Sequence, residues 1–305
     1  MISLQHLTKQ FGETIAVKNV SFQIADGEIF GLIGPDGAGK TTTLRVISTA
    51  MLPTSGSVSV DHLDVTRDAE AVKQLIGYMP QRFALYRDLT VIENLNFFAD
   101  LYGAPLAERH AQVERLLGFA RLLEFKSRRA QNLSGGMQKK LALAATLMHH
   151  PRVLLLDEPT TGVDPVSRRE FWDLITQVHI EGVTIVVSTP YLDEAERCTR
   201  VGLIHHGELI ACDAPAALRA NMPAVVLEGE TDQAMQARTL AAAHAGVRNA
   251  AMHGDVVRLL IDRADRQSAL EAMWQAQGIQ VRHLHTAPPR LEDAFVLMLD
   301  KSARQ

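Results

Sequence analysis

The sequence has few cysteines and no long run of apolar residues. Its two cysteines, Cys198 and Cys212, are not spaced like a metal or redox motif. The longest stretch without a charged residue, residues 46–60, contains a proline, a glycine and six hydroxyl side chains, so it cannot span a bilayer. The first residues lack the order of an export signal. We therefore expect a chain that works in a reducing cytoplasm and does not cross a membrane alone.

The sequence also has no large excess of acidic or basic residues. Lysine and arginine total 31 and aspartate and glutamate total 35, which gives a net charge of −4. Without a global basic field, nothing holds a polyphosphate backbone non-specifically, so we expect no nucleic-acid partner. The 12 histidines include neighbours such as His149 and His150, but no third ligand stands at a metal-site spacing. We interpret them as ordinary core or surface residues.

The pattern of apolar residues predicts two domains of α/β character. Residues 1–33 alternate as antiparallel strands do, residues 82–145 change to a helical period, and strand and helix patterns alternate from residue 153. Continuous apolar strands of this kind are typical of a parallel sheet covered on both faces. Residues 1–222 are the expected first domain, with a helical insert at about 82–145. Residues 223–305 are the expected small C-terminal α+β domain.

A glycine-rich motif follows the predicted strand that ends at Ile33 and precedes a predicted helix. It matches the phosphate-loop pattern in full and consists of Gly34, Pro35, Asp36, Gly37, Ala38, Gly39, Lys40 and Thr41. Backbone amides of Gly37 to Thr42 are expected to point at the β-phosphate from the positive end of the helix. Lys40 is expected to reach the β- and γ-phosphates, and the Thr41 hydroxyl to ligate Mg²⁺.

Two carboxylates stand at the end of the apolar strand VLLLD. In a doubly wound sheet this position lies beside the phosphate loop. Asp157 is placed to hold the Mg²⁺ shell, and Glu158 to orient or deprotonate the water that attacks the γ-phosphate. Together with the phosphate loop, the pair predicts a nucleotide hydrolysis centre.

A third motif, Ser134-Gly135-Gly136, precedes an apolar helix between the other two. Ser134 is a typical helix N-cap, and the glycines let a helix N-terminus approach phosphate, which makes a second anion cradle. With the other two motifs in this order, residues 1–220 resemble the ATP-binding subunit of an ABC transporter. The resemblance implies a P-loop ATPase core that dimerises head to tail. Each ATP then lies between one phosphate loop and the Ser-Gly-Gly loop of a second ATP-binding subunit.

The resemblance assigns three further residues. Phe11 takes the aromatic position that stacks on adenine, and Gln81 is the glutamine that senses Mg²⁺ and water. Asp164 stands in the loop that communicates across the dimer. The implied ligands are ATP and Mg²⁺, and the implied metal-binding residues are Thr41, Gln81 and Asp157.

One departure from the family pattern concerns catalysis. After the strand that begins at Thr184, the family places a histidine that bonds the γ-phosphate, but this chain has Pro190. Proline has neither a side-chain donor nor a backbone N–H. We expect turnover at this chain's own site to fall by about 10²- to 10⁴-fold unless Thr189 or another group substitutes, while ATP binding survives.

The C-terminal segment around Pro288-Pro289 resembles the tail of ATP-binding subunits of ABC-2 type exporters. The resemblance implies an ATPase at the cytoplasmic face of the inner membrane, where it drives an integral membrane permease. By analogy, the permease docks where residues 83–89 meet the helical insert. The second ATP-binding subunit is an identical or a different chain. Two alternatives stay open: a soluble ABC ATPase without a transport role, and a regulator that binds ATP without hydrolysing it.

Overall fold

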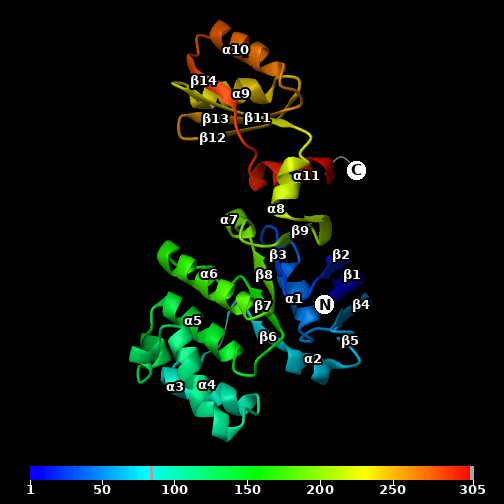
Figure 1. Ribbon diagram of the computed structural model, residues 1–305. Helices are drawn as coiled ribbons and strands as arrows, with labels where there is room; N and C mark the ends of the chain where they lie inside the picture. Colours follow the sequence, from blue (N-terminus) through cyan, green and yellow to red (C-terminus); the bar gives the residue numbers. More distant parts are fainter. Residues whose placement is uncertain (83–84, 303–305) are drawn as a thin grey trace. The chain divides into compact units, whose positions relative to one another are not determined.

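The structure, a computed structural model, describes residues 1–82 and 85–302. It divides into two compact units, Met1–Cys212 and Asp213–Gln305 (Figure 1). No helix in the described residues is long and apolar enough to cross a membrane.

The first unit contains two sheets. The smaller is antiparallel, with the order β2-β1-β4-β5, and its strands are β1 (Ile2–Phe11), β2 (Thr14–Ile24), β4 (Ser55–Val60) and β5 (Leu63–Asp64). The larger has the order β10-β9-β3-β8-β7-β6, and its strands are β3 (Ile29–Ile33), β6 (Ile76–Met79), β7 (Val153–Asp157), β8 (Thr184–Thr189), β9 (Arg200–His205) and β10 (Glu208–Asp213). The strands from β9 to β6 all pair in parallel. The expected α/β core with an antiparallel subdomain is confirmed.

Helix α1 (Lys40–Ile47) lies between the two sheets and forms the centre of the main core. Its buried side chains Leu44 and Ile47 belong to one cluster with Val58 of β4, Leu155 of β7 and Val186 of β8. Burying a side chain of this size contributes about 1.5–3 kcal/mol, so the helix that carries the phosphate loop is held from two sides.

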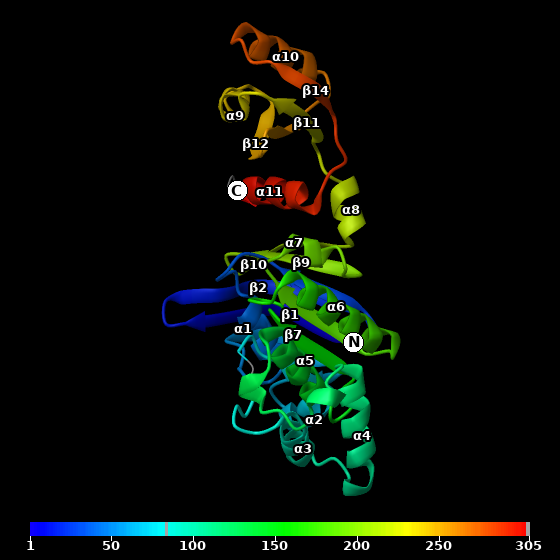
Figure 2. The same ribbon diagram turned by 90° about the vertical axis from the view of Figure 1, so that its left-hand side faces the viewer.

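The remaining helices of this unit fall into two groups. Those that accompany the sheets are α2 (Ala69–Leu75), α6 (Pro165–Ile180) and α7 (Leu192–Ala195). Those of the helical insert, which the two views show together below the sheets (Figure 2), are α3 (Val91–Leu101), α4 (Leu106–Phe119) and α5 (Gly135–Thr146). The expected helical insert is confirmed. The capping box that starts α3 is present, because Thr90 accepts the Glu93 amide and Glu93 accepts the Thr90 amide.

Helix α7 is short, with four residues. The amides of Arg197 and Cys198 donate to the carbonyls three residues earlier, those of Glu194 and Ala195. The chain therefore leaves α7 through a tighter turn rather than a continued α-helix.

The second unit is built on an antiparallel sheet with the order β12-β13-β11-β14. Its elements are α8 (Pro215–Ala220), β11 (Val225–Thr231), α9 (Ala234–Ala242), β12 (Val247–His253), β13 (Val256–Ile261), α10 (Arg266–Ala276), β14 (Val281–Thr286) and α11 (Leu291–Ser302). The β-α-β-β-α-β sequence with this order is the ferredoxin-like arrangement. It confirms the expected α+β character.

Helices cover both faces of this second sheet. Helices α9 and α10 pack on one face around Trp274, and α11 contributes Leu297 to a second cluster on the other face, with Val226 and Leu260. Because α8 packs against α11, the boundary between the units falls at Cys212–Asp213, ten residues before the expected boundary at 222.

A buried arginine joins the second sheet to α11. Arg258 of β13 is 4% exposed and donates to Asp293 from Nε at 3.0 Å and from a terminal nitrogen at 2.5 Å. It also pairs with Glu228 and donates to the Pro288 carbonyl at 2.9 Å. Removing one partner of such a pair leaves an uncompensated buried charge.

We expect Arg258→Met to lower the free energy of unfolding of the second unit by about 3–5 kcal/mol, because Asp293 stays buried without its cation. The measurement is urea unfolding of the full chain followed through Trp274 fluorescence in a Trp172→Phe background. Arg263→Met is the matched control, since the pair of Arg263 with Asp265 is exposed. Equal effects of the two substitutions would contradict the role assigned to Arg258.

Candidate nucleotide-binding site

Three neighbouring strands end at one edge of the large sheet. Ile33, the last residue of β3, is in register with Thr189 of β8, and Asp157 of β7 is in register with Ser188 of β8. The phosphate loop, the acidic pair and Pro190 each follow directly from one of these strands. Parallel register therefore brings the three segments to the same carboxyl edge, where open α/β sheets bind ligands.

The phosphate loop turns sharply into α1 at Gly39. This residue has φ +107°, and a Cβ there would lie 2.4 Å from the Ala16 carbonyl oxygen of β2. Only glycine fits this backbone and this contact. Ala38 is buried, and Thr41 and Thr42 lie in the first turn of α1. The free amides at the start of the helix form an anion site.

The Lys40 ammonium is buried within the loop. Its Nζ donates to the carbonyl oxygens of Gly34 at 2.8 Å and Pro35 at 3.0 Å, and lies 3.2 Å from a carboxylate oxygen of Glu158. A buried cation needs such partners. A phosphate placed in the loop offers the same ammonium a stronger, charged acceptor.

Asp157 is fully buried at the end of β7. Its Oδ1 accepts hydrogen bonds from Thr41 Oγ1 at 3.0 Å and from Ser188 Oγ at 2.7 Å, and Tyr78 Oη lies 3.5 Å from Oδ2. Burial, reinforced by the Asp157 charge, raises the pKa of Tyr78 to about 12, so the phenol keeps its proton. The contact with Thr41 joins the acidic strand end to α1.

Glu158 adopts a backbone conformation that is rare for a residue with a side chain. Its φ is +46°, and its amide donates to both the carbonyl and the hydroxyl oxygen of Ser188, at 3.1 and 3.0 Å. Its carboxylate accepts from Gln81 Nε2 at 2.8 Å and from Thr161 Oγ1 at 3.3 Å, beside Lys40. The two backbone hydrogen bonds offset a strain of about 1–3 kcal/mol and fix the carboxylate at the sheet edge.

Hard oxygen donors at this edge suit a magnesium ion. The hydroxyl of Thr41 and the carboxylate of Asp157 are in contact, and the side-chain amide of Gln81 adjoins Glu158. Mg²⁺ prefers one or two protein oxygens completed by phosphates and water. In the part of the chain that the structure describes, no group of three or more His, Cys, Asp or Glu could hold a metal by itself. These donors therefore fit an ion that arrives with a nucleotide.

Phe11 ends β1 and is 47% exposed, with the Lys9 ammonium 5.1 Å from its ring centre. Its partner in the β1–β2 hairpin is Thr14, two residues before Ala16, which touches the phosphate loop. The ring therefore belongs to the hairpin that flanks the loop and has a free face.

The second cradle lies at the start of α5. Ser134 is its N-cap and accepts the Met137 amide at 3.3 Å. The two glycines have different surroundings. A Cβ on Gly135 would meet nothing within 4 Å, whereas one on Gly136 would lie 2.5 Å from Ser167 Oγ of α6. Gly135 therefore faces open space, and Gly136 permits α5 and α6 to touch.

Asp164 caps α6, three residues before Ser167. Its Oδ1 accepts the amides of Val166 at 3.1 Å and Ser167 at 3.0 Å, and the hydrogen bonds from Ser167 hold the pKa of the carboxyl below its usual range. Within residues 1–82 and 85–302, no hydrogen bond or ion pair joins the Ser134 loop to the phosphate loop. The structure gathers the phosphate loop, Gln81, Asp157 and Glu158 into one site. Gly135 of the Ser134 cradle lines a neighbouring cavity with Gln81 and Thr161, and no residue of the phosphate loop lines that cavity.

Pro190 follows β8 at the same edge as the phosphate loop. The neighbouring Thr189 is 1% exposed, and its hydroxyl oxygen accepts the Tyr191 amide at 3.0 Å. The hydroxyl is thus held inside its own turn.

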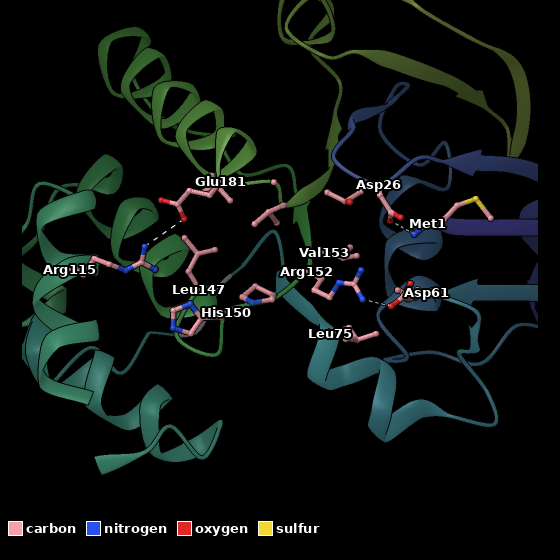
Figure 3. A pocket seen from close by; sticks show the side chains of 16 residues that line it. Met1, Asp26, Asp61, Leu75, Arg115, Leu147, His150, Arg152, Val153 and Glu181 are labelled. Carbon is pink, nitrogen blue, oxygen red and sulfur yellow. Dashed lines mark hydrogen bonds and ion pairs between the residues drawn. The ribbon is translucent and has the colours of Figure 1, made fainter. Parts of the chain in front are cut away.

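A cavity of about 290 Å³ lies at the opposite edge of the sheet, between the core and the helical insert (Figure 3). Val153 and Thr184, the first residues of β7 and β8, line it, and an ion pair between Arg115 and Glu181 crosses it at 3.6 Å. No residue of the phosphate loop belongs to its lining. This cavity is therefore separate from the candidate nucleotide site.

Sequence reasoning missed three residues of the site: Ser188, Tyr78 and Thr161. Each contacts Asp157 or Glu158 through a hydroxyl group. Ser188 could have been found only from the register of β8 against β7. Thr161 carries a weak signal, because a hydroxyl three residues after Glu158 is within reach of that side chain in a turn.

Comparison with known proteins gives the same result as the geometry. The ABC transporter family profile matches residues 17–161. The probable multidrug ABC transporter ATP-binding protein YbhF of Escherichia coli (strain K12) is 40% identical over 98% of this chain. The chain spans 52% of that relative, about half its length. The linearmycin resistance ATP-binding protein LnrL of Bacillus subtilis (strain 168) is 32% identical over the full length of both chains.

Among solved structures, the first unit resembles a dimeric post-hydrolysis state of the ATP-binding cassette MJ0796 bound to ADP and Pi. The TM-score is 0.64 at 29% identity, over 70% of this chain and 98% of that one. With a full-length relative above 30% identity and a complete phosphate site, the chain belongs to the ABC transporter family of ATP-binding proteins.

Proposed function

We propose that the chain binds and hydrolyses ATP to energise an ABC-2 type membrane exporter from the cytoplasmic face of the inner membrane. The single observation that supports ATP hydrolysis is the set of side-chain contacts at the carboxyl edge of the large sheet. Lys40 contacts Glu158, Glu158 contacts Gln81, and Thr41 contacts Asp157. Phosphoryl transfer to water requires a group that binds the phosphates, a carboxylate that binds the metal and a second carboxylate that orients the water.

Each residue has a stated task in this proposal. The amides of Gly37 to Thr42 bind the phosphates, and Lys40 stabilises the charge that develops on them. Glu158, fixed by Ser188, orients the attacking water and accepts its proton. Phe11 stacks on adenine. Thr41, Asp157 and Gln81 hold Mg²⁺, which when bound screens the charge of the phosphates.

The Ser134 cradle serves a second ATP-binding subunit. Within this chain it is separate from the phosphate loop, and Gly135 leaves room for an approaching group. The related cassette MJ0796 is described as a dimer with ADP and Pi. In the proposed dimer, Ser134, Gly135 and Gly136 face the nucleotide of the partner subunit, which is an identical or a different chain, and Asp164 lies at the same junction.

Where the partner subunit is a different chain that retains the histidine, Pro190 makes the two ATP sites of the dimer unequal; in a dimer of identical chains both sites lack it and both are slow. Pro190 offers no donor to a γ-phosphate, and the Thr189 hydroxyl oxygen is held within its own turn because it accepts the Tyr191 amide. This chain's own site therefore binds ATP and turns it over slowly. Its Ser134 loop completes a faster site on a partner subunit that retains the donor.

The membrane partner is an integral permease. The names of the two relatives mention multidrug transport and linearmycin resistance, which supports export of a small hydrophobic compound. The proposed docking surface runs from Phe83, which lies outside the described residues, to Leu89. It includes Tyr86, a residue that is 47% exposed and whose ring packs on Phe97 of α3. The C-terminal unit is assigned no contact with the permease.

We expect the chain to co-purify with membranes from wild-type cells and to appear in the soluble fraction when the permease gene is deleted. The measurement is quantitative immunoblotting of washed membranes. A soluble ABC ATPase or a free regulator would give the same distribution in both strains, and that result would contradict the exporter proposal.

In the assembled transporter, we expect Ser134→Arg to abolish most ATP turnover, because it fills the cradle of the faster site. Glu158→Gln is expected to lower turnover only slightly, since it acts on the slower site. Steady-state phosphate release from reconstituted complexes compares the two. If Glu158→Gln lowers turnover more than Ser134→Arg does, this chain's own site is the faster one and the assignment is wrong.

We expect Pro190→His to raise phosphate release at this chain's own site by at least about tenfold, because it restores a positioned donor to the γ-phosphate. The rate is measured on the reconstituted transporter that also carries Ser134→Arg, so that the other site is silent. Pro190→Ala is the matched control, as it restores the backbone N–H, as histidine does, but adds no side-chain donor. No gain with histidine would mean that another group already fills this role.

A further inference from the structure

A buried carboxylate that the proposed mechanism does not use lies on α7. Glu194 is 1% exposed, and its Oε1 accepts a hydrogen bond from Thr160 Oγ1 at 2.5 Å. Its Oε2 is also buried but has no hydrogen-bond partner among the described residues. Burying a charge with half its hydrogen bonds missing is costly, so this side chain needs an explanation.

The cation nearest to this carboxylate is held loosely. Arg168 Nε lies 3.6 Å from Glu194 Oε1, too far for a hydrogen bond, and this nitrogen is itself buried without a hydrogen-bond partner in the described chain. The guanidinium lies 4.3 Å over the Tyr191 ring and 3.6 Å from Asp193. In the described part of the chain, Arg168 Nε has no hydrogen-bond partner and lies 3.6 Å from a carboxylate whose second oxygen also has none, so a small movement is enough to form a charged hydrogen bond.

The cluster joins three segments of the site. Tyr191 and Glu194 follow Pro190 at the end of β8. Thr160 stands two residues after Glu158, whose carboxylate also accepts the hydroxyl of Thr161. Arg168 stands four residues after Asp164, and its amide donates to the Asp164 carbonyl at 2.9 Å. A movement of any one segment is felt by the other two through Glu194.

We propose that Glu194 is a positioning residue that couples the chain's own phosphate site to the loop ending at Asp164. The inference rests on the proposed function, because that loop is taken to face the partner subunit. When a γ-phosphate draws Glu158 and the following residues toward the phosphate loop, Thr160 pulls the Glu194 carboxylate. Arg168 then closes onto the carboxylate and shifts the start of α6. ATP binding at this chain's own, slower site thereby changes the position of the residues that face the partner subunit.

The test measures amide hydrogen exchange of residues 161–164 in the full chain, with and without MgATP. In the wild-type chain, MgATP is expected to slow exchange of this segment. In Glu194→Gln we expect ATP affinity within about twofold of wild type and an ATP-dependent protection smaller by about tenfold, the usual size of a coupling between sites. Asp193→Asn is the matched control, because Asp193 also lies 3.6 Å from Arg168 but is exposed and does not contact Thr160.

A second pair of variants guards against simple misfolding. Thr160→Val removes the hydroxyl that holds Glu194 and is expected to lose the protection, whereas Thr160→Ser keeps the hydroxyl and should behave as wild type. Full protection in Glu194→Gln, or equal loss in Asp193→Asn, overturns the coupling role and leaves the proposed function intact. A wild-type chain that binds ATP without protecting the segment overturns the coupling as well. A chain that does not bind MgATP overturns both.

Discussion

Asp157 is the buried charge around which the candidate site is arranged. It has no exposed surface, and the hydroxyls of Thr41 and Ser188 donate to the same carboxylate oxygen. The first hydroxyl belongs to α1 and the second to β8, so one carboxylate ties the phosphate loop and the neighbouring strand to β7. The same Ser188 then accepts the Glu158 amide and stabilises its left-handed backbone. The position of the Glu158 carboxylate thus depends on the same Ser188 side chain that donates a hydrogen bond to Asp157.

This arrangement places all the proposed phosphate-binding groups within the chain, but not all the parts of the proposed active site. Lys40 and the amides of α1 need no partner subunit, because the fold itself supplies them. The Ser134 cradle is built equally well, with a capped helix and a glycine that faces open space, yet it has no bonded connection to the phosphate loop within the described chain. Two half-sites with no bond between them in the described chain favour a dimer in which a second subunit supplies the missing half.

The contact of Gly136 with Ser167 adds a second constraint. Because α5 and α6 touch there, the position of the Ser134 cradle depends on the start of α6, which Asp164 caps. The cluster of Glu194, Thr160 and Arg168 reaches the same helix from the other side. In the proposed dimer, this helix is the route by which a site without the γ-phosphate donor would influence the partner subunit.

The sequence by itself determined the elements that carry local chemistry. The phosphate loop, the acidic strand end and the Ser134 cap could be predicted because short spacing and backbone geometry decide them. The α/β core and the helical insert follow from periodicity. The tertiary structure alone decided which strands are neighbours. That order made Ser188 a partner of Asp157, distinguished Gly135 from Gly136, and brought Glu194 to Arg168. These contacts join residues 26 to 31 positions apart, and strand register and packing set them, which no local pattern encodes.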